Sequence, residues 1–438
     1  MVAALTAATV GPASGSVPAQ LRGVATNIFT AQTASSVVSM AASQRSLLYY
    51  ASLEADTPQS LALIAGEMAK VEAAGGSVVR LTLPWSLLET DYRQPGQPPD
   101  FDPAAAARIS GFFTLAQADH LRVVVNFSNS PCGRSSAPWK NCASPGEWTT
   151  YPPVLASDYG NAVGEIIRRW GADIYGIEVW NEPNSQFFLD GIDECDPSDP
   201  AAVIGPSALA TRAAAYVPLV DAAYRAVKAS AYPHIAVVAD GSAFADTTFL
   251  QDLYANGMEG HYDALSVHPY QLWMRFSPPP TTCAQRQHAR LVWSASDPAT
   301  SFPDPEFSFG AGLAAIHQVM AAHLDRAPIW ITEMGFTSCQ VAPAPLRGAT
   351  GQWVGNADLT GACVGPTNQA AWLARSFLMA ARLPYVGMTL MYSSRDSTQS
   401  VGPYAFDSFG FLESDLNAKP SYNAVKDAWT CLDYGPCS

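Results

Sequence analysis

Short runs rich in β-branched and aromatic residues recur along the chain, and longer Ala-rich stretches with helical spacing, such as "SLALIAGEMAKVEAAGG", lie between them. This strand-then-helix order favours βαβ units around a parallel sheet. Eight such steps predict a closed α/β fold, the (β/α)8 or TIM barrel. The predicted strands cover residues 22–29, 77–85, 121–128, 175–181, 234–241, 264–270, 328–335 and 387–393.

The length of the chain and its uniform composition predict how it is divided into domains. A chain of 438 residues fits one large barrel, and no shift in composition marks a second domain. We therefore expect a single (β/α)8 domain over residues 21–438, closed by a helix at 420–430. Residues 1–20 have an apolar run and a small-residue tail without a basic start, so we expect the remnant of an export signal. No stretch approaches 18 consecutive apolar residues, which predicts no membrane span.

The charge of the chain indicates which kinds of binding partner it can have. The net charge is -14, from 24 basic and 38 acidic residues, and the basic residues do not cluster. Because phosphate neutralisation needs clustered Lys and Arg, we expect no nucleic-acid partner. Hydrophobic residues make up 48% of the chain and charged residues 14%, which indicates a globular protein.

The eight cysteines are an even number and sit mostly in Gly-, Pro- and Ser-rich segments. Free thiols or a metal site are the alternatives, but no C-x-x-C spacing supports them, so we predict disulfides and an oxidising compartment, secreted or periplasmic. Proximity alone, among 105 possible connectivities, suggests four pairs. They are Cys132 with Cys142, Cys339 with Cys363, Cys431 with Cys437, and Cys195 with Cys283.

Four long segments follow predicted strands three, six, seven and eight, at residues 129–157, 271–309, 339–367 and 393–419. In a barrel, such segments gather on the C-terminal face, where active sites are built. We expect the disulfides to staple these loops and limit their entropy.

Two predicted strands end in a glutamate. In "IEVWNEPNSQ" the alternation of strand residues predicts that Glu178, Trp180 and Glu182 share the inward face, with Glu182 at the tip. In "IWITEMGFTS", Glu333 is followed by Gly335, which permits close backbone approach. A helix-capping glutamate and an arginine-paired glutamate are the alternatives. Two carboxylates meeting in one cleft serve glycoside cleavage, in which one donates a proton and the other attacks or stabilises the sugar.

These motifs carry a family resemblance. "VWNEPN" and "ITEMGF", with "VVRLTLPWS" and "LSVHPY", resemble the retaining glycoside hydrolases of clan A, most of all family 39 and family 5 members. The resemblance implies a (β/α)8 barrel without a cofactor or metal, in which Glu182 is the acid/base and Glu333 the nucleophile.

The resemblance also implies roles for neighbouring residues. Asn181 should hydrogen-bond the 2-hydroxyl of the sugar, and Arg80 should pair with the nucleophile unless it is a structural arginine. His268 and Tyr270 should donate to the nucleophile or the sugar; a core histidine is the alternative for His268. Tyr392 takes the place of the tryptophan that many clan members have at strand eight.

Tryptophans near strand ends suggest platforms for sugar faces, with core packing as the alternative for each. The substrate-binding candidates among them are Trp85 and Trp139. Several platforms would favour an extended glycan.

We therefore expect a monomeric retaining glycoside hydrolase that cleaves an oligo- or polysaccharide, or an exopolysaccharide, by double displacement. An exo-acting clan A furanosidase, similar to arabinofuranosidases, is the alternative enzyme. A carbohydrate-binding barrel without turnover is the alternative from another class.

Overall fold

The computed structural model describes residues 21–26, 58–89, 93–137, 147–185, 189, 207–277, 282, 290–339, 357–396 and 408–435. Within them, parallel strands form a closed barrel in the order β1-β11-β9-β6-β5-β4-β3-β2, so the predicted TIM barrel is confirmed. Each predicted strand overlaps an observed one. The barrel strands are β1 (Leu21–Thr26), β2 (Val78–Pro84), β3 (Arg122–Ser128), β4 (Ile174–Val179), β5 (Ala236–Ala243), β6 (Ala264–His268), β9 (Ile329–Ile331) and β11 (Val386–Tyr392).

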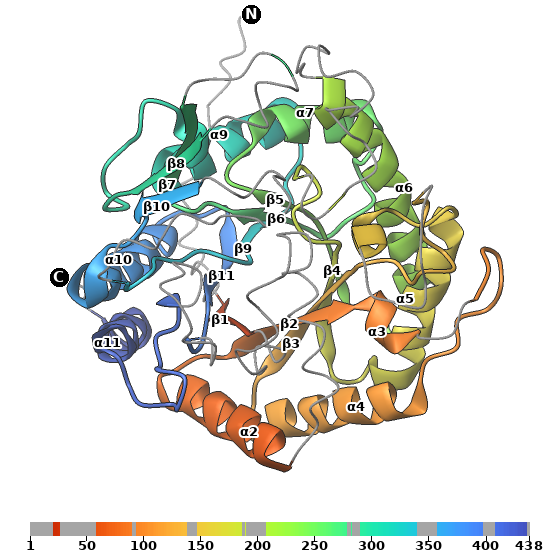
Figure 1. Ribbon diagram of the computed structural model, residues 1–438, viewed down its shortest axis with the longest axis horizontal. Coiled ribbons are helices and arrows are strands. Elements are labelled where there is room, and N and C mark those ends of the chain that lie inside the picture. Colours follow the sequence, from red (N-terminus) through yellow and green to blue (C-terminus); the bar gives the residue numbers. More distant parts are fainter. Residues whose placement is uncertain are drawn as a thin grey trace, which may run out of the picture.

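Helices surround the strands on the outside (Figure 1). Aspartates begin two of them: Asp102 accepts from the Ala105 N–H at 2.8 Å before α4, and Asp246 accepts from the Phe249 N–H at 2.9 Å before α7. The helices are α2 (Pro58–Ala73), α3 (Trp85–Leu88), α4 (Pro103–Ala118), α5 (Ala156–Trp170), α6 (Ser207–Lys228), α7 (Thr247–Ala255), α9 (Phe309–Ala322), α10 (Gly365–Ala380) and α11 (Pro420–Tyr434), with 3-10 turns η3 (Glu147–Thr150) and η4 (Pro305–Phe307).

The N-terminal half of the barrel interior is apolar. Trp330 lies among Val78, Val124, Val238 and Met388 in a buried cluster. Its ring occupies the space that Gly176 and Gly387 leave, because a Cβ added at Gly176 would lie 3.1 Å from the Trp330 ring and one added at Gly387 would lie 3.3 Å from it. The lower half of the barrel is therefore filled by side chains. Polar residues from later positions on the same strands form the layer above it.

The long loops contain structure that the sequence did not predict. β7 (Leu272–Ser277) pairs antiparallel with β8 (Arg290–Ala295), and β10 (Ala357–Gly361) pairs parallel with β8. This small sheet stands beside the barrel, at the upper left of Figure 1, and joins the loop after β6 to the loop after β9. The long loops after β6 and β9 are thus paired with each other.

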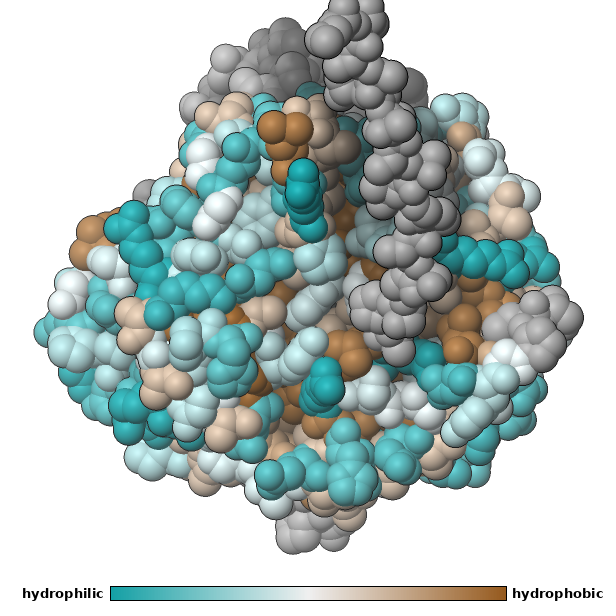
Figure 2. All heavy atoms as spheres, turned by 180° about the vertical axis from the view of Figure 1, so that it is seen from behind, coloured by the Kyte–Doolittle hydropathy of each residue, from teal (hydrophilic) through white to brown (hydrophobic). Residues whose placement is uncertain are grey.

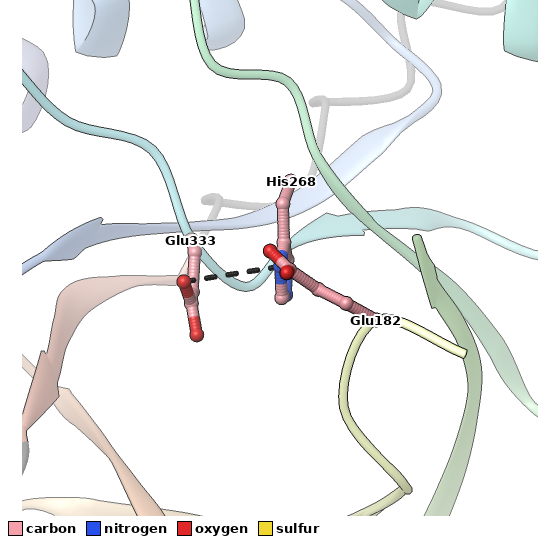
Figure 3. A group of neighbouring side chains, drawn as sticks. All are labelled: Glu182, His268 and Glu333. Carbon is pink, nitrogen blue, oxygen red and sulfur yellow. Dashed lines mark hydrogen bonds and ion pairs between the residues drawn. The ribbon is translucent and has the colours of Figure 1, made fainter. Parts of the chain in front are cut away.

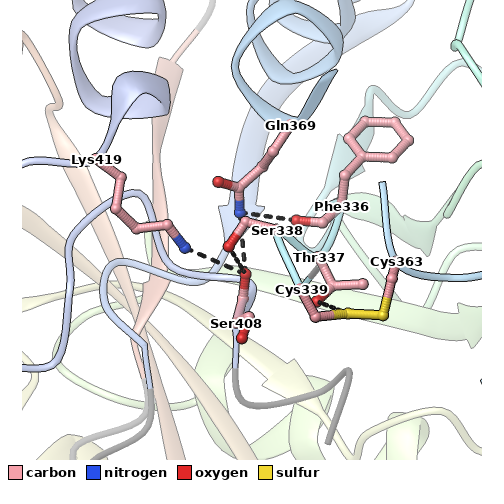
Figure 4. The surroundings of a disulfide bond; sticks show 8 residues. All are labelled: Phe336, Thr337, Ser338, Cys339, Cys363, Gln369, Ser408 and Lys419. Carbon is pink, nitrogen blue, oxygen red and sulfur yellow. Dashed lines mark hydrogen bonds between the residues drawn. A yellow bond between two sulfur atoms is a disulfide. The ribbon is translucent and has the colours of Figure 1, made fainter. Parts of the chain in front are cut away.

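The disulfide between Cys339 and Cys363 is present, with Cα atoms 4.9 Å apart, which confirms that predicted pair. Close to it, the Gln369 amide donates to the Phe336 carbonyl at 2.9 Å and the Ser408 carbonyl at 3.1 Å (Figure 4). These contacts fix the chain after β9 against the start of α10. Cys132 and Cys431 are also disulfide-bonded. The other cysteines of the predicted pairs, Cys142, Cys195, Cys283 and Cys437, lie outside the described residues.

Hydrophilic residues cover much of the face seen in Figure 2, with hydrophobic residues in smaller areas between them. Large hydrophobic side chains that are well exposed in the described residues are scattered: Val154, Leu155, Leu324 and Tyr434. No helix in the described part of the chain is long and apolar enough to cross a membrane. The expected export remnant at residues 1–20 lies outside the described residues.

Candidate active site

The end of β4 departs from the regular alternation that the sequence predicts. Trp180 has a φ of 64°, and its ring is fully buried 6.2 Å from the ring of Tyr159, which belongs to α5 outside the barrel wall. The prediction that Glu178, Trp180 and Glu182 share one inward face is therefore wrong for Trp180. The left-handed backbone at this residue turns its ring outward and redirects the chain into the following loop.

That loop is fixed to the neighbouring strand β5. The Glu182 N–H donates to the Gly241 carbonyl at 3.1 Å, and Asn184 both accepts from the Ala243 N–H at 2.9 Å and donates to Asp246 at 3.0 Å. Glu182 has a φ of 42°, an uncommon conformation for a glutamate. These bonds hold its side chain over the C-terminal end of the barrel.

Glu333 follows β9, and Arg80 on β2 reaches it through the barrel interior. The Arg80 Nη1 donates to Glu333 Oε1 at 2.5 Å, its Nη2 donates to Asn181 Oδ1 at 2.8 Å, and its Nε donates to Glu178 Oε2. Arg80 is 1% exposed and Glu333 9% exposed. A single buried guanidinium on β2 therefore organises groups from β4 and from the ends of β4 and β9.

Residues at and after the end of β6 complete the cluster (Figure 3). His268 Nδ1 lies 2.9 Å from Glu182 Oε1 and 3.8 Å from Glu333 Oε2, and the Tyr270 hydroxyl donates to Glu333 Oε2 at 2.8 Å. One carboxylate oxygen of Glu182, one of Glu333 and one His268 nitrogen lie within 4.8 Å of one another. Five of the predicted site residues besides His268 thus meet at one place: Arg80, Asn181, Glu182, Tyr270 and Glu333.

The electrostatics differ between the carboxylates. Burial raises the pKa of Glu182, and the negative charge of Glu333 raises it further, against the lowering effect of His268. Burial lowers the pKa of His268, but the charge of Glu333 and hydrogen bonds with Glu178 and Glu182 outweigh it and raise that pKa to about 10. Glu182 is thus favoured as the protonated carboxyl and suits an acid.

The three ligand atoms are close enough to hold a metal ion, but their partners do not suit one. Both Glu333 oxygens already accept hydrogen bonds, from Arg80 and Tyr270, and His268 Nδ1 faces Glu182. A cation bound at Glu333 would lie beside the Arg80 guanidinium, a like charge. The groups of this cluster therefore already hydrogen-bond one another.

The remaining residues that were predicted to bind substrate differ in where the structure places them. Trp85 is fully buried, with ring contacts to Phe127 at 6.0 Å and Tyr159 at 6.1 Å, so its proposed stacking on a sugar is wrong. Its place in the first turn of α3 turns the ring into the layer between barrel and helices. Tyr392 is half-buried, 5.7 Å from the Phe409 ring, which in turn lies 6.1 Å from the Tyr270 ring. Trp139 lies outside the described residues.

Three residues for which the sequence motifs predict no role, Glu178, Thr332 and Asn126, lie directly beneath the cluster. Thr332 donates to Glu178 Oε1 at 2.6 Å and Asn126 donates to Glu178 Oε2 at 3.2 Å. Arg80 and Thr82 lie on the same, inward side of β2, and Asn126 on β3 is the register partner of Thr82. Asn126 could therefore have been found from the position of Arg80 if the pairing of β2 with β3 had been known from the sequence. Thr332 was indicated only by its place next to Glu333.

No protein-family model and no curated protein sequence matches the chain. Solved structures do. A family 39 glycoside hydrolase from Bacteroides cellulosilyticus WH2 has a TM-score of 0.57 and 18% identity, over 85% of this chain and 61% of that one. A family 5 subfamily 18 protein from Streptomyces cattleya, solved with GlcNAc, has a TM-score of 0.54 and 14% identity, over 97% and 82%.

A monomeric β-xylosidase from Caulobacter crescentus CB15 has a TM-score of 0.52 and 17% identity, over 84% of this chain and 64% of that one. This chain therefore spans less than two thirds of the length of the β-xylosidase and of the family 39 protein. At such identities the likeness establishes the fold, which matches the resemblance drawn from the sequence motifs.

Proposed function

We propose that this protein is a retaining glycoside hydrolase that cleaves an oligo- or polysaccharide by double displacement. The observation that carries the proposal is the approach of Glu182 and Glu333, whose oxygens lie within 4.8 Å. Retaining enzymes hold the two carboxyl groups about 5–5.5 Å apart, whereas inverting enzymes need about 6.5–9.5 Å to admit a water. One oxygen of each carboxylate lies within 4.8 Å of the other, which is closer than an inverting pair and favours retention.

Glu333 is the nucleophile in this proposal. Arg80 and Tyr270 both donate to it, which stabilises the carboxylate anion. It attacks the anomeric carbon while Glu182 gives its proton to the departing oxygen, and a glycosyl ester on Glu333 results. Glu182, now ionised, takes a proton from the water that attacks the same carbon, which releases the sugar and restores both groups.

Asn181 is proposed to bind the sugar. Its Oδ1 accepts from Arg80, which orients the amide so that Nδ2 is left to donate to the 2-hydroxyl of the sugar. A hydrogen bond there strengthens as the transition state forms. His268 forms a hydrogen bond with Glu182, and Tyr270 donates one to Glu333. Tyr392 lies beside the aromatic pair Tyr270 and Phe409 and is the candidate surface for the sugar ring.

We further propose that the protein works outside the cytoplasm as a monomer that needs no cofactor. Its disulfide between Cys339 and Cys363 is compatible with an oxidising compartment. The single chain described here supplies both carboxylates of the site.

Replacement of the nucleophile is the first test. Glu333→Ala should lower hydrolysis by at least about 10⁴-fold, because no ester can form. Added azide should restore part of the activity with an activated aryl glycoside and give a glycosyl azide of inverted configuration, which product NMR identifies. Full activity of this variant, or a rescued product of retained configuration, would contradict the assignment.

Replacement of the acid is the second test. Glu182→Ala should slow phenyl glycosides, whose leaving group needs a proton, far more than 2,4-dinitrophenyl glycosides, by about 10²-fold or more in kcat/KM. An equal loss for both substrates would argue against an acid. Glu259 is an exposed glutamate paired with His323, so Glu259→Ala serves as the control and should leave the rates of both substrates unchanged.

The substrate is found by a panel of 4-nitrophenyl pyranosides and furanosides, starting with β-xylosides because one similar structure is a β-xylosidase. Hydrolysis of furanosides alone would favour the furanosidase alternative. Binding of glycans without turnover in the whole panel would favour the non-catalytic barrel. With polysaccharides, a ladder of oligomers means internal cleavage and a monosaccharide alone means cleavage from the end.

A further inference from the structure

A third glutamate lies beneath the two catalytic candidates. Glu178 on β4 is 0% exposed and has no opening to the cleft. Its Oε2 accepts from Arg80 Nε and from Asn126 Nδ2 at 3.2 Å, and its Oε1 accepts from the Thr332 hydroxyl at 2.6 Å. All three of these partners are donors, so this carboxyl is held as the anion. Arg80, His268 and Thr332 outweigh the effect of burial and lower its pKa to about 2.

The Thr332 hydroxyl fixes the protonation of the His268 ring. A threonine has one hydroxyl proton, and here it is donated to Glu178. Thr332 Oγ1 must therefore accept from His268 Nε2, 3.1 Å away, so Nε2 carries a proton. The other nitrogen, Nδ1, faces oxygens of Glu182 at 2.9 Å and Glu333 at 3.8 Å. The charge of Glu333 and the hydrogen bonds with Glu178 and Glu182 raise the pKa of the ring to about 10, so Nδ1 also carries a proton and donates it to Glu182 Oε1, which leaves Glu182 Oε2 to carry the carboxyl proton.

A count of charges then decides the state of Glu182. The cations are Arg80 and His268, and the anions are Glu178 and Glu333, so the buried cluster is neutral only when Glu182 carries its proton. Groups that face Glu182 and His268 come from every adjacent strand: Arg80 on β2, Glu178 on β4, Asp240 on β5, Tyr270 after β6 and Glu333 after β9. Burial raises the pKa values of Asp240 and Tyr270 well above normal, which favours the neutral form of both groups.

Building on the double displacement proposed above, we propose that Glu178 is a positioning residue, a permanent buried anion that keeps the proton on Glu182 until Glu333 is esterified. Ester formation removes the charge of Glu333 while Glu182 gives its proton to the leaving oxygen and becomes an anion. Arg80 and His268 again balance two anions, Glu178 and now Glu182. The cluster is neutral before and after the step. Without Glu178 it would carry a positive charge in both states.

The first test uses Glu178→Gln and the pH dependence of kcat/KM. Removal of a negative charge favours ionisation of Glu182, so its pKa should fall, and the basic limb of the profile should move to lower pH by about 1 unit or more. The probe is the phenyl glycoside of the sugar that the panel identifies, because phenol leaves poorly without a proton. Glu178→Asp retains the charge and is the matched control: it should keep the basic limb in place even where kcat falls.

A purely structural role would lower activity in both variants without moving the limb of Glu178→Gln, and that result would overturn the proposal. The wild-type protein supplies an independent measurement if Glu178→Gln does not fold. With ¹⁵N-labelled histidine, and with His268→Asn to assign its signals among the 7 histidines, both ring nitrogens of His268 should be protonated at pH 7. A ring nitrogen without a proton would equally overturn it.

Failure of this proposal and failure of the proposed function give different results. If the chain is no hydrolase, the wild type hydrolyses no glycoside in the panel, yet the histidine spectrum still reports the charge state of the cluster. If only the role of Glu178 is wrong, the Glu333→Ala and Glu182→Ala variants behave as expected while the Glu178→Gln profile keeps its basic limb.

Discussion

At the scale of the residue, Gly335 shows how tightly the site is packed. A Cβ at this position would lie 2.2 Å from the Tyr392 carbonyl oxygen and 2.8 Å from Phe409 Cδ1. Gly335→Ala should therefore displace Phe409 and the Tyr270 ring beside it, lower kcat by about tenfold or more, and cost about 1–3 kcal/mol of stability. Gly164 on α5 has no atom within 4 Å of its Cβ position, so Gly164→Ala should retain activity. Kinetics and chemical denaturation of the two variants give the comparison; equal behaviour would contradict it.

Single residues also mark what sequence can and cannot reveal. The glutamates after β4 and β9 were found because strand patterns end at them, and Gly335 because a glycine there permits close approach. Trp180 was placed on the wrong face, because its positive φ follows from contacts with Tyr159 and the β3 strand that no local pattern contains. Glu178 received no role, because its partners come from three other strands.

At the scale of the element, Arg134 joins the loop after β3 to α3 and α5. It is 0% exposed, and its Nε lies 2.5 Å from Glu89 while its Nη1 lies 3.1 Å from Asp158. Arg134→Met should cost about 3–5 kcal/mol, because it leaves two buried carboxylates without their cation. Denaturant unfolding measures this cost. Arg225→Met, which breaks an exposed pair with Asp221 on α6, should leave stability nearly unchanged. A loss of similar size in both variants would argue against burial as the cause.

Elements were the most predictable level of this structure. All barrel strands and the closing helix α11 were predicted, because period-two and helical spacing are local properties of the sequence. The sheet of β7, β8 and β10 was missed because its strands sit in Pro- and Ser-rich segments and β10 pairs with a strand more than 60 residues earlier in the chain. Pairing over that distance leaves no local pattern.

At the scale of the whole molecule, burial of Asp240 makes stability depend on pH. Burial raises the pKa of Asp240 well above 3.8 and the charge of Asp246 raises it further, against the lowering effect of hydrogen bonds from Ser242. Below the unfolded pKa, Asp240 is protonated in both states; as pH rises above it, only the unfolded state ionises, so stability is lost. Asp240→Asn, which also tolerates the φ of 83°, should raise Tm at pH 7 and not at pH 3.

Thermal unfolding at the two pH values tests this expectation. Asp427 is an exposed aspartate on α11, so Asp427→Asn is the control and should change Tm little at either pH. A gain for Asp240→Asn that is equal at pH 3 and pH 7 would contradict an origin in ionisation.

The Trp330 ring and the apolar side chains around it fill the barrel below the carboxylates. Reactants therefore have a single route, over the C-terminal rim. In the proposed reaction, the alcohol set free in the first step must depart by the path along which water arrives for the second. An alcohol that stays there would compete with water for the sugar held on Glu333, so under the proposed mechanism the filled barrel favours the joining of sugars as well as their cleavage.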